Sequence, residues 1–207
     1  MSAPAVTVAA TGAEKRLSAF LDGERRRWLA VDPDLAAVVD AVVELVDAGG
    51  KRLRPACCHW AYVGAGGDPF DPVVADAGAA LELLHAFALL HDDVMDGSAT
   101  RRGRPAAYRA FIDAHRAGGW RGEARRFGEG AAVLAGDLAF AWADELLVDA
   151  PVDARRLWGD LRVELALGQY LDVLGAARGS ASAEQALRTL RYKSGKYTIE
   201  RPLHLGA

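Results

Sequence analysis

Apolar residues recur at three- and four-residue spacing along most of the chain, and strict alternation of apolar and polar residues is scarce. Ala, Leu, Glu and Arg are common in these segments and favour helices, so the pattern predicts an all-α protein. Gly- and Pro-containing breaks separate the expected helices, and Ser182 with Gln185 has the spacing of a capping box for a last one. The expected ranges are 14–30, 35–47, 56–63, 73–96, 106–117, 130–149, 153–177 and a final helix after Ser182.

Residues 73–96 form the longest apolar pattern and carry several polar residues at its end, so we expect this helix to be central. The first residues are small and apolar and lack the basic region of a signal peptide, which predicts a flexible tail over 1–12. No linker divides the remainder, so 13–207 is expected to form one domain.

A net charge of −3 and a pI near 6.0 give no general attraction for nucleic acid. No apolar run reaches the roughly 20 uninterrupted residues of a transmembrane helix, so none is expected. The two cysteines, Cys57 and Cys58, are adjacent and fit neither a disulfide framework nor a zinc site. We therefore expect a cytoplasmic protein.

The segment His91-Asp92-Asp93-Val94-Met95-Asp96 ends the central helix and is its sharpest chemical signal. Asp92 and Asp96 are four residues apart and project from one face, where they repel each other and meet an unfavourable helix dipole. A cation should compensate, and carboxylates shared with a substrate phosphate suit Mg²⁺. The alternative is a solvated acidic helix end.

Basic segments lie on both sides of these acids. Arg101-Arg102-Gly103-Arg104-Pro105 follows them and could bind phosphate in a bidentate manner, or could be an ordinary surface loop. Gly49 to Pro55, which reads GGKRLRP, places cations at the start of a helix and predicts an anion site that is not a P-loop. His85 lies seven residues before Asp92 on nearly the same stripe, although a core histidine is the alternative. Two phosphate sites beside one carboxylate pair imply two anionic substrates.

These segments and three later ones resemble the successive motifs of the polyprenyl synthetase family. The later motifs are Gly136-Asp137, Gly168-Gln-Tyr-Leu-Asp172 and Tyr192-Lys-Ser-Gly-Lys-Tyr-Thr198, and Glu82-Leu-Leu-His85 precedes the aspartates. The resemblance implies an isoprenoid synthase-type helical bundle around a central cavity. It also implies condensation of an allylic diphosphate with isopentenyl diphosphate, together with a homodimer.

By the same resemblance, the Mg²⁺ ions that clamp the allylic diphosphate are held by Asp92, Asp93 and Asp96. Arg101 and Lys193 would contact that diphosphate. The remaining expected substrate-binding residues are Lys51, Arg54, His85 and Arg102 for isopentenyl diphosphate, with Gln169 and Ser194 at the cavity. Asp137 and Asp172 would orient neighbours, or be ordinary acids on a helix surface.

Product length is expected to depend on Phe87 and Ala88. Ala88 lies one turn before Asp92, in the path of a chain growing away from the metals. In the resembling family, one aromatic residue followed by a small one goes with twenty-carbon products, so we predict geranylgeranyl diphosphate.

The sequence departs from the family pattern in one respect. Members of the family carry a second aspartate-rich motif after the segment that corresponds to Lys193, and this sequence does not contain it. The sequence is therefore interpreted as truncated before that motif. A class I terpene cyclase is the nearest alternative, but it needs no second diphosphate site. A non-catalytic partner of a full-length synthase is another.

Overall fold

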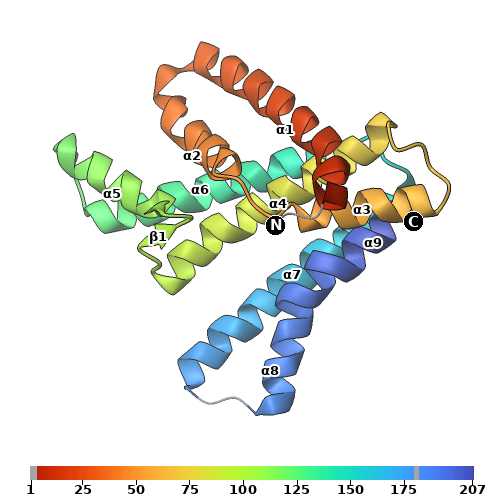
Figure 1. The fold of residues 1–207 in the computed structure, drawn as a ribbon. Helices are drawn as coiled ribbons and strands as arrows, with labels where there is room; N and C mark the ends of the chain where they lie inside the picture. The colour runs from red at the N-terminus through yellow and green to blue at the C-terminus, as the bar shows by residue number, and fades with distance from the viewer. Residues whose placement is uncertain (1–3, 180–181) are drawn as a thin grey trace. The chain divides into compact units, whose positions relative to one another are not determined.

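The computed structural model describes residues 4–179 and 182–207, and most of these residues are helical (Figure 1). The chain forms two compact units, each built from separated segments. The first unit contains the described residues of Met1–Arg16, Lys51–Leu81 and Leu146–Ala207, and the second contains Leu17–Gly50 and Glu82–Glu145. Helices α1 (Pro4–Val31) and α4 (Pro72–Asp96) contribute residues to both units.

In the first unit, a helical run packs along the long helix α7 (Val152–Arg178) (Figure 1). This run consists of α8 (Ala183–Leu190), the π-helix η2 (Arg191–Glu200) and α9 (Arg201–Gly206). Helix α3 (Leu53–Gly64) packs against α9, where Gly206 comes so close to the Cys58 carbonyl that a side chain would not fit. Backbone contact, rather than side-chain packing alone, therefore positions α9 against α3.

In the second unit, α6 (Ala124–Glu145) packs against α2 (Ala36–Asp47) and α5 (Ala107–Ala117). A short 3₁₀ helix, η1 (Pro33–Leu35), precedes α2, and Asp32 caps it by accepting from the Asp34 amide at 2.9 Å. The strands β1 (Thr100–Arg101) and β2 (Arg104–Pro105) form a small antiparallel hairpin between α4 and α5. Buried apolar residues join these elements, including Tyr108, Ile112 and Ala132.

The predicted all-α class is confirmed, and the Ser182–Gln185 capping box is present with both hydrogen bonds. Several boundaries differ. Residues 4–12 are helical where a flexible tail was expected, because Ala9 and Ala10 are small enough to pack and are buried. Helix α6 begins at Ala124, whereas residue 130 was the expected start. The loop after α5 is therefore shorter than its glycines suggested. The π-helix was not predicted.

Helix α4 is long and apolar enough to cross a membrane by length and composition alone. Within its most apolar stretch, 61% is buried inside the protein, as in the core helix of a globular fold. This is weak support for a membrane span, and no other helix of the described residues meets the test.

Candidate active site

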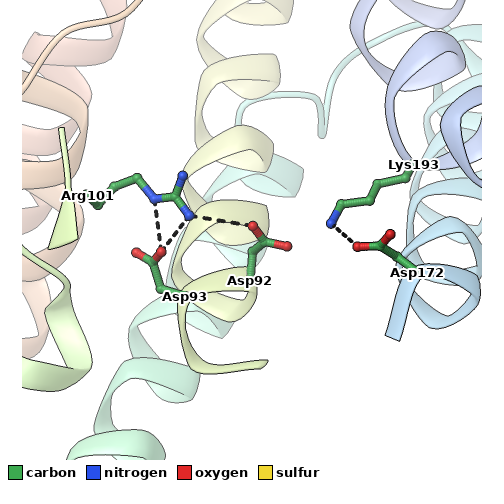
Figure 2. Close-up of polar contacts among 5 residues, drawn as sticks. All are labelled: Asp92, Asp93, Arg101, Asp172 and Lys193. Carbon is green, nitrogen blue, oxygen red and sulfur yellow. Dashed lines mark hydrogen bonds and ion pairs between the residues drawn. The ribbon is translucent and has the colours of Figure 1, made fainter. Parts of the chain in front are cut away.

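The aspartates that end α4 meet an arginine from the β1–β2 hairpin (Figure 2). Nε and Nη2 of Arg101 donate to Oδ1 of Asp93 at 2.9 and 2.5 Å, and Nη2 lies 3.5 Å from Oδ2 of Asp92. Asp93 is only 3% exposed, so water screens this ion pair weakly. The hydrogen bond from Arg101 to Asp93 raises the pKa of the guanidinium above its ordinary value. Arg101 therefore supplies part of the positive charge that this anionic helix end requires.

The hairpin turn sets the positions of both neighbouring arginines. Arg102 and Gly103 have φ angles of 53° and 78°, as a two-residue hairpin turn with two left-handed residues requires. Nη1 of Arg102 donates to the Leu45 carbonyl at 2.8 Å, near the end of α2, where carbonyls lack helical partners. Arg101 is thus directed to the aspartates and Arg102 to α2.

His91 precedes the aspartates and is held against α6. Its Nε2 lies 3.0 Å from the Val133 carbonyl and 3.4 Å from Oδ1 of Asp137. A Cβ at Gly136 would overlap the His91 ring, so the glycine allows the imidazole to reach this position. The glycine of the Gly136-Asp137 motif therefore has a local explanation, and the orienting role predicted for Asp137 stays a prediction.

The two residues predicted to set product length lie one turn before His91 and Asp92 on α4. The Phe87 ring centroid lies 4.6 Å from that of His91 and 4.7 Å from that of Phe140 on α6. Both Phe87 and Ala88 are half-buried. Phe87 is thus fixed by ring contacts, and the predicted role of the pair in chain length stays a prediction.

In the first unit, Lys193 of the π-helix contacts α7 (Figure 2). Its Nζ donates to Oδ2 of Asp172 at 2.6 Å. One turn earlier on α7, a Cβ at Gly168 would lie 2.5 Å from the Lys193 nitrogen and 2.6 Å from the Tyr192 carbonyl carbon. The Gly168 and Asp172 motif thus brings the Lys193 backbone close and orients its ammonium group.

Arg54, in the first turn of α3, contacts the same π-helix. Its guanidinium lies 4.0 Å from the centroid of the Tyr197 ring, and Nη2 donates to Oγ1 of Thr198 at 3.1 Å. Its Nε is buried without a hydrogen-bond partner. The residue before α3, Arg52, has a φ of 49° and is bonded to Glu14 at 3.0 Å, which fixes the chain where α3 begins. Arg54 is therefore rigidly held while one of its donors remains unpaired.

The other predicted residues lie on α4, on α7, on the π-helix and in the segment before α3, and neither unit contains all of them. His85 and Gln169 are half-buried, Ser194 is half-buried within the π-helix, and Lys51 and Asp96 are exposed. The second unit contains His85, Phe87, Ala88, Asp92, Asp93, Asp96, Arg101 and Arg102. The first unit contains Lys51, Arg54, Gln169, Lys193 and Ser194.

A metal at the aspartates would have few protein ligands. Across the residues that the structure describes, no three His, Cys, Asp or Glu side chains are grouped to hold a metal ion. Asp92 and Asp96 lie one turn apart on α4, whereas Asp93 accepts from Arg101 through Oδ1. Two carboxylates fit Mg²⁺, which commonly takes its other ligands from water and substrate phosphate. The metal role predicted for Asp93 stays a prediction.

The sequence reasoning missed a cluster around Glu164 on α7. Arg201 donates to this carboxylate from Nε at 2.8 Å and from Nη2 at 2.7 Å, and the ammonium of Lys196 donates to it as well. The Arg201 hydrogen bonds lower the pKa of Glu164 to about 2, with Lys196 contributing in the same direction. The basic residues of the last segment were visible in the sequence, but their shared partner was not.

Comparison with known proteins identifies the family. Residues 36–207 match the family model described as Polyprenyl synthetase. The chain is 33% identical over 158 residues to a nonaprenyl diphosphate synthase of Mycobacterium tuberculosis, covering 75% of this chain and 42% of the relative. It is also 33% identical over 156 residues to a geranylgeranyl diphosphate synthase of the same organism, covering 73% and 39%.

A solved structure agrees in fold. The crystal structure of geranylgeranyl pyrophosphate synthase from Corynebacterium glutamicum, complexed with isoprenyl diphosphate and magnesium, superposes with a TM-score of 0.87 at 36% identity. The match covers 97% of this chain and 58% of that one, so the chain spans about half the length of its relatives. With the family model matched over most of its length, this chain belongs to the polyprenyl synthetase family.

Proposed function

We propose that this protein is a Mg²⁺-dependent prenyltransferase that joins an allylic diphosphate to isopentenyl diphosphate. The observation that carries the proposal is the pair Asp92 and Asp96 at the end of α4, beside an Arg101 that Asp93 holds in place. The names of the related proteins support the same class of reaction. Because the chain spans about half of their length, the activity is proposed for the complete gene product.

The reaction breaks the allylic C–O bond, and the diphosphate leaves with the bonding electrons. The double bond of isopentenyl diphosphate then forms the new C–C bond, and one proton passes to a diphosphate oxygen. Bound Mg²⁺ would supply positive charge to the leaving diphosphate. Arg101 would add a charge-assisted contact from a guanidinium that Asp93 has already oriented, so little reorganisation is needed.

Residues of the first unit would contact the diphosphate groups of both substrates. Lys193, oriented by Asp172, would contact the allylic diphosphate. Arg54, which is held beside Thr198, and Lys51 would contact isopentenyl diphosphate. By the resemblance to the family, His85 and Arg102 are proposed for isopentenyl diphosphate. A second diphosphate site is what separates prenyl transfer from a class I terpene cyclase, which needs one.

Finer properties belong to the same proposal. A twenty-carbon product, geranylgeranyl diphosphate, is consistent with Phe87 followed by Ala88 and with the named relatives of that specificity. The apolar body of α4 would keep water from the allylic cation. We also propose a homodimer located in the cytoplasm.

The test measures prenyl transfer by the complete gene product with isopentenyl diphosphate, an allylic diphosphate and Mg²⁺. Asp92→Ala should lower kcat more than tenfold, a loss of over about 1.4 kcal/mol in transition-state stabilisation, while circular dichroism stays unchanged. Asp113→Ala, which removes an acid with a 72% exposed side chain on α5, is the control and should leave kcat unchanged. More than a tenth of wild-type kcat in Asp92→Ala would refute the metal assignment.

A further inference from the structure

The π-helix requires an explanation, because such helices are rare and are mostly single-turn bulges. Here the π-helical segment covers the ten residues Arg191–Glu200. Its wide turns must be stabilised from outside the segment. The strongest external contacts converge on Glu164, which receives the ammonium of Lys196 and two hydrogen bonds from Arg201 at 2.7 and 2.8 Å.

Glu164 begins a stripe of contacts along α7. Residues 164, 168 and 172 are four apart, so they lie one above another on the same helix face. Glu164 accepts from Lys196 within the π-helix and from Arg201 directly after it. Gly168 allows the π-helix backbone to approach, and Asp172 accepts from Lys193 at 2.6 Å. The three positions together fix how the π-helix is rotated against α7 and where it lies along the α7 axis.

The other side of the π-helix carries Arg54. Tyr197, which stacks under the Arg54 guanidinium, directly follows Lys196, and Thr198 accepts a hydrogen bond from Arg54. Lys196 also lies 3.7 Å from Glu200 and has its Nζ 5.2 Å from the centroid of the Tyr192 ring. A shift of the π-helix would therefore move both Lys193 and Arg54, although these residues are proposed to bind different substrates.

We propose that Glu164 is a positioning residue that, through Lys196 and Arg201, fixes the π-helix and thereby places the two diphosphate-binding cations Lys193 and Arg54. This inference rests on the proposed function for the identity of the ligands. Glu164 itself is held by three donors and touches no substrate in this role. Its loss should affect both substrates together, whereas a change at Lys193 or Arg54 alone should mainly affect one.

The experiment compares wild-type complete gene product with Glu164→Gln, which keeps the size of the side chain and removes its charge. We expect backbone amides of residues 191–200 to exchange hydrogen at least tenfold faster, while those of α6 are unchanged. Calorimetric titration with inorganic diphosphate and Mg²⁺ should show a Kd raised at least fivefold. In steady-state assays, KM should rise for both substrates, and kcat should change less than either KM.

Two further variants keep the result interpretable. Glu184→Gln removes an 83% exposed partner of Arg188 on α8 by the same substitution, and it should leave exchange, Kd and KM unchanged. Lys196→Met leaves the Glu164–Arg201 contact in place and should produce smaller changes in the same directions. If Glu164→Gln fails to fold, the outcome is decided by Lys196→Met.

The outcomes separate this inference from the proposed function. Unchanged exchange in 191–200, or faster exchange with Kd and both KM values within twofold of wild type, would overturn the positioning role. A lower kcat with unchanged KM would also overturn it, because that indicates only a smaller folded fraction. If the wild type binds inorganic diphosphate but transfers no prenyl group, the proposed function fails, while the weaker binding of Glu164→Gln still supports the inference.

Discussion

Three glycines of α7 allow a direct test of how closely the π-helix packs. At Gly159 and Gly175, an added Cβ would meet nothing within 4 Å. At Gly168 it would lie 2.5 Å from the Lys193 nitrogen, 2.6 Å from the Tyr192 carbonyl carbon and 2.9 Å from the Lys193 Cα. Replacement of each glycine by alanine therefore makes the same chemical change on one helix in different surroundings.

The expected changes in the free energy of unfolding differ in sign among these variants. Alanine is favoured over glycine inside a helix by about 1 kcal/mol, so Gly159→Ala and Gly175→Ala should stabilise the protein by up to that amount. Gly168→Ala gains the same helix propensity but meets main-chain atoms, which cannot rotate away as a flexible side chain could. Overpacking of this kind costs about 1–3 kcal/mol, so Gly168→Ala should be less stable than the other two by that difference.

Urea unfolding followed by circular dichroism measures these differences, with the m-value checked for equality among the variants. Gly168→Ala should also raise KM for the allylic substrate, because the methyl group moves Lys193 away from Asp172. Equal stability of all three variants, within about 0.5 kcal/mol, would mean that the π-helix is not in backbone contact with α7. That result would also weaken the role assigned to Glu164.

Three further predictions concern single residues. Arg54→Ala should raise KM for isopentenyl diphosphate much more than for the allylic substrate. Steady-state kinetics with each substrate varied in turn measures both values, and equal increases in the two KM values would contradict the prediction. Ala88→Phe should shorten the main product by at least one isoprene unit, as measured by chromatography of dephosphorylated products, and an unchanged distribution would exclude this turn of α4 as the cavity floor. The folded-state pKa of Glu164, about 2, lies below its ordinary value of 4.5, so its contribution to stability is complete above about pH 4.5 and is lost as the pH falls toward 2. The stability of Glu164→Gln should accordingly fall less than that of the wild type between about pH 4.5 and 2, as measured by acid unfolding. An identical pH dependence of stability in wild type and variant would count against this contribution of Glu164.

Local patterns were sufficient to predict much of the fold. Apolar spacing identified α4 with an error of one residue at its start, and the capping box at Ser182 was correct because both partners lie within one turn. The aspartates at the end of α4 and the arginines after them could be found together because they are close in sequence. Where an error occurred, as at the start of α6, several glycines suggested a longer loop than the chain forms.

Contacts between distant residues could not be predicted in this way. Lys196 and Arg201 reach Glu164 across 32 and 37 residues, and Arg54 reaches Thr198 across 144. Nothing in the local sequence distinguishes Glu164 from an ordinary helix-surface acid. The π-helix was missed for the same reason, because its wide turns are held by these contacts and not by a sequence pattern of its own.

In the proposed reaction a metal would supply charge that the proposed diphosphate-binding cations lack, because these cations already have carboxylate partners. Arg101 is paired with Asp93, and Lys193 is paired with Asp172. Each partner orients its cation and cancels much of its charge, so neither cation offers a full positive charge to a diphosphate. A diphosphate carries several negative charges, and burial of that charge is unfavourable unless it is balanced. In that proposal, Mg²⁺ held by Asp92 and Asp96 would supply the missing charge, whereas the paired cations would supply geometry.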